Sequence, residues 1–227
     1  GPPGDRGHPV VLAYAAEHDL ALDRHPSAEA QVAAVADDIA YSNHDLDDGL
    51  RAGLFELDDV LGLPLAGPSF REVLANHPDL ERTRLINEGL RRVIDLMVSD
   101  LVAESRHRLA DQAPASVEDV RSLPEPVIAF SPAVREGIET LRSFLHAHMY
   151  GHWRVRRMQR KAQRVVDALF RTFMEAPDCL PPDWRARATA AGEADQASLI
   201  GDYIAGMTDR FALDEYDRLV DLSSRHL

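Results

Sequence analysis

The chain is 227 residues long, with 45% hydrophobic and 28% charged residues, which is enough to bury the core of one large domain. Its formal charge of −13 argues against general binding to a nucleic acid backbone and leaves room only for a local basic surface. The single cysteine, Cys179, excludes an intrachain disulfide, and the sequence lacks an apolar run of about 18 residues that would span a membrane. We therefore expect a cytoplasmic protein without a membrane partner. The chain begins Gly1-Pro2 without Met, which suggests a fragment or a processed chain.

Helical patterns follow one another almost throughout the chain, and no strand-like alternation stands out, so the predicted fold class is all-α. In the first half, helices are expected at Pro9–His18, from Ser27 through an acidic stretch, at Leu57–Leu61, Ser69–Asn76 and Leu80–Leu109. In the second half, a connector at Ala113–Pro126 precedes helices at 131–148, 154–175, 196–207 and 209–222, with a break at 176–182. No Gly-rich phosphate loop and no Gly-x-Ser-x-Gly elbow is found, so a P-loop or α/β-hydrolase assignment has no support.

The stretch Ala36–Asp48 concentrates five aspartates, one tyrosine and one histidine, with no Lys or Arg before Arg51. A helix that needs only a wet outer face more often uses Glu, Lys and Arg in compensating pairs. Uncompensated acid is what a divalent cation or a polar substrate requires of a protein. The alternative is an ordinary solvated polar face.

The helical period divides this stretch into two faces, at about 100° per residue. One stripe carries the polar residues Asp37, Tyr41, His44, Asp45 and Asp48. The opposite stripe is expected to face the core and carries Val32, Val35, Ile39, Leu46 and Leu50. Alanines flank Asp37 on its own side, which lets another helix or a ligand approach the carboxylate closely.

Other groups of residues give weaker indications of a functional site. Basic residues recur at helical spacing at Arg154, Arg157, Lys161 and Arg164. They fit either a solvated face paired with acidic surface elsewhere or a contact with an anion, a nucleotide or single-stranded nucleic acid. His146, His148 and His152 lie near Tyr150 at a helix end, but their spacing is not a zinc pattern, so an interface is the simpler interpretation. Cys179 lies beside prolines with no sign of activation, and we expect it to be inert.

Several segments together resemble the bacterial deoxyguanosine triphosphate triphosphohydrolases, the dGTPase-like branch of the HD-domain superfamily. The likeness runs through Ser27–Gln31, Ala36–Tyr41, His44–Gly53, Ala129–Pro132, Phe144–Tyr150 and Asp202–Ala212. It covers essentially the whole chain. It implies that residues 1–112 are the remainder of the HD-type helical core and that residues 113–227 are the C-terminal helical region of the family.

The resemblance also implies a chemistry. Such enzymes hydrolyse a deoxynucleoside triphosphate (dNTP), here one like dGTP, to the deoxynucleoside and inorganic triphosphate. Their divalent metal ion, Mg, Mn or another transition metal, is held by a His, an adjacent His-Asp pair and a distant Asp. Asp37 matches that last aspartate. Tyr41 and Asp45 match positions that contact the phosphates and the sugar 3′-hydroxyl. Arg142 resembles a position that binds the terminal phosphate, and Tyr150 one that packs beneath the deoxyribose; Asp38, Asp47 and Asp48 receive no role.

This chain departs from the family pattern at the metal site. The family's first His, its His-Asp pair and its catalytic histidine have no match in this sequence. The two candidate pairs, His18-Asp19 and His44-Asp45, do not fit, because one precedes the acidic helix and the other lies on the helix of Asp37. The chain therefore resembles the C-terminal portion of the enzyme, and we expect it to be inactive alone and to form a homo-oligomer. The alternative function is a non-catalytic helical module that binds nucleotides or single-stranded nucleic acid.

Overall fold

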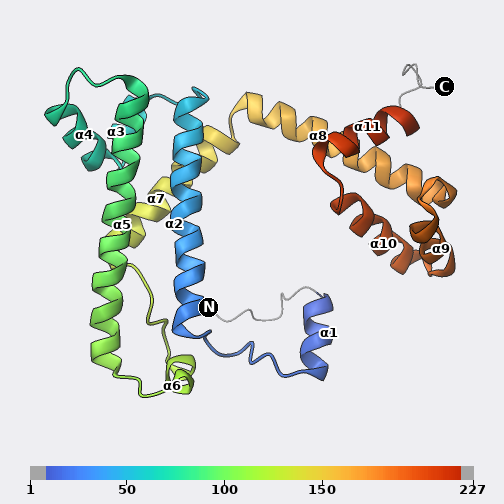
Figure 1. The fold of residues 1–227 in the computed structure, drawn as a ribbon, viewed down its shortest axis with the longest axis horizontal. Helices are drawn as coiled ribbons and strands as arrows, with labels where there is room; N and C mark the ends of the chain where they lie inside the picture. Colours follow the sequence, from blue (N-terminus) through green and yellow to red (C-terminus); the bar gives the residue numbers. More distant parts are fainter. Residues whose placement is uncertain (1–8, 221–227) are drawn as a thin grey trace. The chain divides into compact units, whose positions relative to one another are not determined.

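A computed structural model describes residues 9–220, and within that range the chain is helical and contains no strand (Figure 1). The predicted all-α fold class is confirmed. The chain divides into two compact units, residues 1–151 and 152–227. The predicted division at residue 112 concerned family regions and stays a prediction, whereas the boundary of the compact units falls between Gly151 and His152.

The first unit contains seven helices among its described residues and ends in a π-helical turn. They are α1 (Pro9–Glu17), α2 (Ala28–Arg51), α3 (Leu57–Leu61), α4 (Gly67–Asn76), α5 (Arg82–Gln112), α6 (Val117–Ser122), α7 (Pro132–Leu145) and the turn His146–Tyr150. The long helices α2 and α5 lie side by side, α7 packs on α2, and α4 packs on α5 (Figure 1). Their shared core is apolar and includes the fully buried Leu46, Phe70, Val93, Met97 and Leu141.

Most of the predicted apolar face of α2 is buried, with one exception. Ile39, Leu46 and Leu50 are buried and Val35 packs against them, but Val32 is exposed. The physical reason is that Gln31 takes the buried position in this turn. Its side-chain amide donates to the Pro26 carbonyl (2.9 Å), and its oxygen accepts the Ile128 N–H (3.1 Å). These hydrogen bonds compensate for the burial of a polar side chain.

Helix starts follow the capping residues that the sequence offers. Ser27 accepts the N–H of Ala30 and opens α2, and Ser131 accepts the N–H of Val134 and opens α7. The predicted connector 113–126 contains α6, which was missed although a capping box of Ser116 and Asp119 marks its start.

The second unit contains α8 (Trp153–Glu175), a 3₁₀ turn (Pro177–Cys179), α9 (Pro182–Ala190), α10 (Glu193–Ala205) and α11 (Asp209–Leu219). The sequence did not predict α9, and residues 221–222 of the expected last helix lie outside the described residues. A small core joins α8 to the other helices through Val165, Leu169, Phe173, Ile200 and Ile204. The first three turns of α8, before Val165, contribute no buried residue to it.

Among the described helices, none combines the length and the apolar character that crossing a membrane requires.

Candidate functional site

Three of the predicted substrate contacts form one hydrogen-bonded chain across the contact between α2 and the end of α7. The hydroxyl of Tyr150 donates to Oδ2 of Asp45 at 2.6 Å. The hydroxyls of Tyr150 and Tyr41 are hydrogen-bonded to each other. Asp45 is buried, with 9% of its surface exposed, whereas Tyr41 is 59% exposed. The structure therefore joins a buried carboxylate to an open surface through two tyrosines.

Local structure places these side chains. Tyr41 and Asp45 are one helical turn apart on α2, so they lie on the same face. Tyr150 ends the π-helical turn, which Gly151 closes by donating its N–H to the His146 carbonyl at 2.9 Å. A Cβ at Gly151 would collide with the carbonyl oxygen of Ala147, so only glycine fits this closure.

Aromatic packing supports the same turn from the side. The ring of Phe144 meets Phe55 edge-on, with 4.9 Å between centroids, and His148 stacks on Phe144 at 4.3 Å. The Nδ1 of His148 lies 3.0 Å from the Phe144 carbonyl. These contacts give His148 a structural role in the turn that carries Tyr150.

The electrostatics of the chain keep Tyr150 neutral. Its burial raises the pKa of the Tyr150 hydroxyl far above the usual 10.0, and the hydrogen bonds to Asp45 and Tyr41 raise it further. At neutral pH the hydroxyl is therefore a fixed proton donor to the carboxylate.

Arg142, the predicted phosphate ligand, lies on α7 and forms an ion pair with α2. Its Nη2 is 2.9 Å from Oδ1 of Asp38, and both side chains are about half exposed. Asp38 was given no role from the sequence, because the family resemblance assigns none to it. A helical period also does not show which residue of another helix lies opposite. Asp47, which also received no role, pairs with Arg51 at 2.6 Å.

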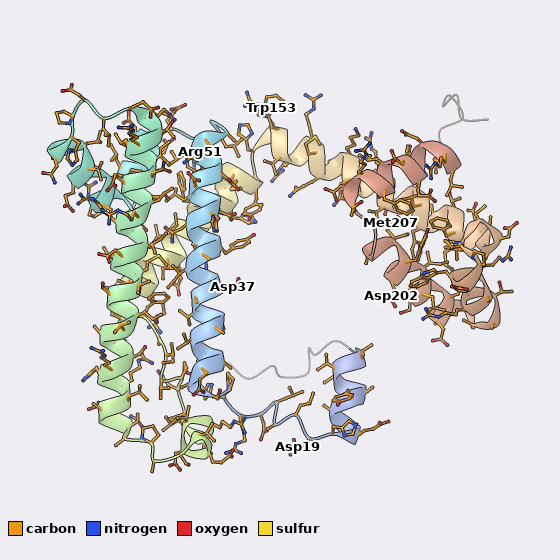
Figure 2. The ribbon with its side chains drawn as sticks, in the orientation of Figure 1. Asp19, Asp37, Arg51, Trp153, Asp202 and Met207 are labelled. Atoms are coloured by element: carbon orange, nitrogen blue, oxygen red, sulfur yellow. The ribbon has the colours of Figure 1, made fainter. Side chains whose placement is uncertain are left out.

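Asp37, the predicted metal ligand, is exposed on the middle of α2 (Figure 2). Among the residues that the structure describes, no group of three or more His, Cys, Asp or Glu is placed to hold a metal ion. Asp19 of the rejected His18-Asp19 pair accepts the N–H of Ala21 in the connection before α2 (Figure 2). The described residues therefore offer Asp37 as one ligand and do not complete a metal site.

The basic segment of α8 is larger than the four residues first singled out. Its six cations are exposed, and none makes an ion pair within residues 9–220: Arg154, Arg156, Arg157, Arg160, Lys161 and Arg164. The guanidinium carbons of Arg154 and Arg157 lie 5.5 and 5.6 Å from the ring centroid of Trp153. Trp153, at the start of α8 (labelled in Figure 2), has 57% of its surface exposed. Sequence reasoning missed Arg156, Arg160 and the tryptophan, although the sequence contains no acidic residue from 151 to 166.

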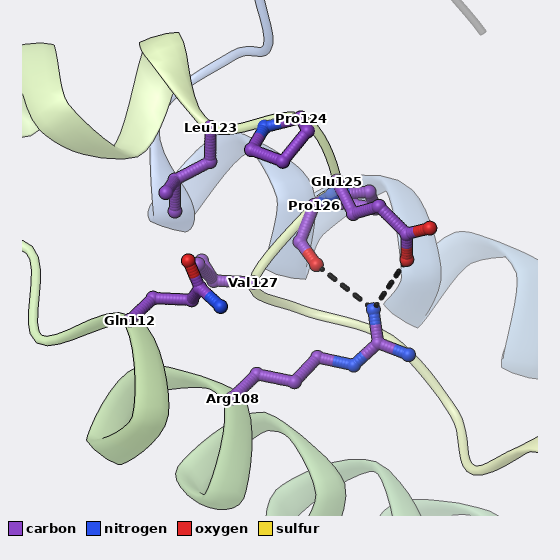
Figure 3. A pocket seen from close by; sticks show the side chains of 7 residues that line it. All are labelled: Arg108, Gln112, Leu123, Pro124, Glu125, Pro126 and Val127. Carbon is purple, nitrogen blue, oxygen red and sulfur yellow. Dashed lines mark hydrogen bonds and ion pairs between the residues drawn. The ribbon is translucent and has the colours of Figure 1, made fainter.

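The remaining features that could form a site do not join the residues described above. His152 caps α8 by accepting the N–H of Arg154 at 3.2 Å, and Cys179 is an exposed free thiol. A hollow of about 180 Å³ lies between the end of α5 and the segment after α6 (Figure 3). Its two charged residues, Arg108 and Glu125, pair with each other at 3.5 Å (Figure 3). Arg108 is also bonded to Glu104 at 2.8 Å and to the Pro126 carbonyl at 3.1 Å. This hollow shares no residue with the predicted site.

Comparison with known proteins adds the family. Residues 128–218 match the model of the phosphohydrolase-associated domain. Over 213 residues the chain is 47% identical to a protein of Parvibaculum lavamentivorans, 46% to one of Caulobacter vibrioides and 48% to one of Cereibacter sphaeroides. Each of these is named a deoxyguanosinetriphosphate triphosphohydrolase-like protein. The chain is therefore similar to this dGTPase-like family over nearly its whole length.

The likeness covers 93 to 94% of this chain in the three comparisons. In the other direction it covers 54 to 56% of the relatives, so the chain spans about half the length of the curated relatives it matches. The resemblance seen in the sequence is thereby confirmed at the level of the family.

Proposed function

We propose that this chain forms the sugar- and phosphate-binding wall of a dNTP triphosphohydrolase. The enzyme would cleave a dNTP, one like dGTP, into the deoxynucleoside and inorganic triphosphate. The observation that carries the proposal is the chain Asp45–Tyr150–Tyr41, in which two helices bring together three residues that the family resemblance assigns to the substrate. Arg142, on the helix α7 that leads into the turn of Tyr150, supplies a cation that pairs with Asp38 of α2.

Each residue has a role that follows from its chemistry. Asp45 can accept a hydrogen bond from the sugar 3′-hydroxyl. Tyr150 donates its one proton to Asp45, so Tyr41 donates to Tyr150, and on nucleotide binding Tyr41 would turn this donor to a phosphate oxygen. The bond from Tyr150 to Asp45 fixes the tyrosine ring beneath the deoxyribose, where the ring would exclude a 2′-hydroxyl. Arg142 would neutralise charge on the triphosphate leaving group.

A divalent metal ion belongs to the proposed reaction, with Asp37 as one ligand and the others from outside the described residues. When bound, such an ion would activate water or polarise the α-phosphate. We therefore propose that the 227-residue chain alone does not turn over a dNTP. A nucleotide substrate and a single cysteine fit a cytoplasmic enzyme, and the family resemblance extends the proposal to a homo-oligomer.

The selectivity for the deoxy sugar tests this assignment. In the protein expressed from its complete gene, Tyr150→Ala should lower the ratio of kcat/KM for dGTP to that for GTP by about tenfold or more, which is about 1.4 kcal/mol. Tyr14→Ala, which changes an exposed tyrosine of α1, is the matched control and should leave the ratio unchanged. A ratio that Tyr150→Ala does not alter would remove Tyr150 from the sugar site.

A second function, contact with single-stranded nucleic acid, is favoured by one observation. The basic face of α8 holds six cations without an ion pair in the described part of the chain, and Trp153 is exposed among them. Cations bind the phosphates of a single strand and aromatic rings stack on its bases. The charge distribution agrees, because residues 152–227 contain as many basic as acidic residues and the whole charge of −13 lies on residues 1–151.

Fluorescence anisotropy of a labelled single-stranded oligonucleotide tests this second function. We expect salt-dependent binding that Arg157→Gln together with Lys161→Gln weakens at least about tenfold. Arg187→Gln is the matched control, since Arg187 also stacks on a tryptophan, Trp184, at 4.9 Å, but lies on α9. Absence of binding at low salt, or equal loss in the control, would refute the nucleic acid contact.

A further inference from the structure

Asp38 lies in line with the proposed substrate residues of α2. Asp38, Tyr41 and Asp45 are spaced by three and four residues, so they follow one face of the helix, the face that meets α7 and Tyr150. The ion pair of Asp38 with Arg142 joins the same two helices, with 2.9 Å between Oδ1 and Nη2. Asp38 thus adds a second negative group to a surface where a triphosphate is proposed to lie.

A carboxylate and a phosphate use the same donors of a guanidinium. Arginine binds either anion through its planar fork of N–H groups, and the pairs are frequently bidentate. In this structure Asp38 occupies Nη2 of Arg142, and the side chains of both are about half exposed. A phosphate that approached Arg142 would therefore meet a cation that is already oriented and partly neutralised.

We propose that Asp38 holds Arg142 in position and competes with the terminal phosphate of the nucleotide for it. This inference rests on the proposed phosphate role of Arg142. When Asp38 is replaced, a ligand whose terminal phosphate reaches the Arg142 guanidinium binds more tightly, because no carboxylate occupies that guanidinium. A shorter polyphosphate that does not reach Arg142 leaves the ion pair intact and gains nothing. Asp38 would then weaken the preference for a triphosphate over a diphosphate, because only the triphosphate has to displace its carboxylate from Arg142.

The size of the competition follows from the exposure of the pair. Exposed ion pairs contribute little because water and salt screen them, so removal of the competing carboxylate should tighten phosphate binding only about two- to fivefold. The effect must require Arg142, and this requirement separates local competition from a general change of charge.

Calorimetric titration of the 227-residue chain with inorganic tripolyphosphate tests the proposal. We expect Asp38→Asn to bind tripolyphosphate about two- to fivefold more tightly than the unmodified chain, because Arg142 then has no competing carboxylate. Asp48→Asn is the matched control, because it removes the same charge from an exposed position of α2 whose side chain is not part of the Arg142 pair, and it should leave the affinity unchanged. In the background of Arg142→Gln, Asp38→Asn should have no effect.

Every other outcome contradicts one specific part of the proposal. Weaker binding by Asp38→Asn would mean that Asp38 only positions Arg142, and an equal gain in Asp48→Asn would mean long-range charge; either result overturns the competition. Unchanged binding by Arg142→Gln would overturn the phosphate role of Arg142, and with it that part of the proposed function. Absence of tripolyphosphate binding by every variant would overturn the competition in this chain, whereas the proposed function is tested separately by the products that the protein forms from its complete gene.

Discussion

Asp45 is the residue whose environment most constrains the site. A buried carboxylate is costly unless it accepts hydrogen bonds, and Tyr150 supplies one from the end of α7. The sequence placed Tyr41 and Asp45 on one stripe of a helix, because the period of an α-helix fixes which residues share a face. It did not show by physical argument that Tyr150 meets them, since that contact depends on how α7 packs on α2. The family resemblance supplied this part of the site.

Removal of the Tyr150 hydroxyl should reveal this dependence. Tyr150→Phe leaves Asp45 without its donor and should lower the free energy of unfolding by about 1–3 kcal/mol. Tyr41→Phe is the control, because an exposed hydroxyl is solvated when unpaired, and should cost less than about 0.5 kcal/mol. Urea denaturation followed by circular dichroism measures both. Equal costs would contradict the assigned role of the Tyr150 bond.

The raised pKa of Tyr150 predicts a loss of stability at high pH. Burial, together with the bonds to Asp45 and Tyr41, makes the folded state retain a proton that the unfolded chain releases near pH 10. The stabilising contribution is complete below about pH 10 and falls as the pH rises above it, because the folded state then binds more protons than the unfolded state. Urea denaturation at several pH values between about 8 and 11 should show a shallower decline for Tyr150→Phe than for the unmodified chain. The same slope in both would exclude Tyr150 as the titrating group.

Elements were predicted well where their apolar period is long. The buried face of α5 contains Leu85, Ile86, Leu90 and Met97, all within the helix expected from the sequence. The short helices α6 and α9 were missed because a helix of one or two turns, or a proline-rich start, offers little period to detect. The sequence alone also does not predict where two helices pack closely together, and Gly89 is an example. A Cβ there would lie under 3.0 Å from the ring of the fully buried Phe70.

Gly89→Ala should therefore destabilise the protein although alanine favours helix. The methyl group must displace the Phe70 ring, at a cost of about 1–3 kcal/mol that outweighs the gain of about 1 kcal/mol in helix propensity. Gly201→Ala in α10 has nothing within 4 Å of the added Cβ and should instead gain up to about 1 kcal/mol. Differences in the free energy of unfolding from urea titration decide the matter. Stabilisation by Gly89→Ala would show that the packing of α4 on α5 is looser than described.

On the scale of the molecule, the described part of the chain has two separate hydrophobic cores. One gathers residues between Ile39 and Leu145, and the other those between Val165 and Ile204. The boundary at Gly151 could not be predicted from the sequence, because the π-helical turn and α8 follow one another with a single glycine and a capping histidine between them. The proposed substrate residues all lie in the first unit and the basic segment of α8 in the second.

Because the two units have separate cores, we expect a substitution in one core to destabilise that unit more than the other. Phe173→Ala removes a fully buried ring from the second core and should cost about 3–5 kcal/mol there. Hydrogen exchange measured by mass spectrometry should show faster exchange in α8–α11, while α2, α5 and α7 keep their protection. Loss of protection in both units to the same extent would show a single cooperative fold.

We propose that this chain contributes a metal ligand and the substrate wall of a dNTP triphosphohydrolase. The most direct test is the analysis of products formed from dGTP and a divalent metal ion by the protein expressed from its complete gene, with and without Asp37→Ala. We expect deoxyguanosine and inorganic triphosphate in equal amounts from the unmodified protein. In an Asp37→Ala protein that remains folded, we expect kcat/KM to fall at least about a thousandfold, roughly 4 kcal/mol. Full turnover by folded Asp37→Ala, or release of pyrophosphate in place of triphosphate, would contradict this proposal.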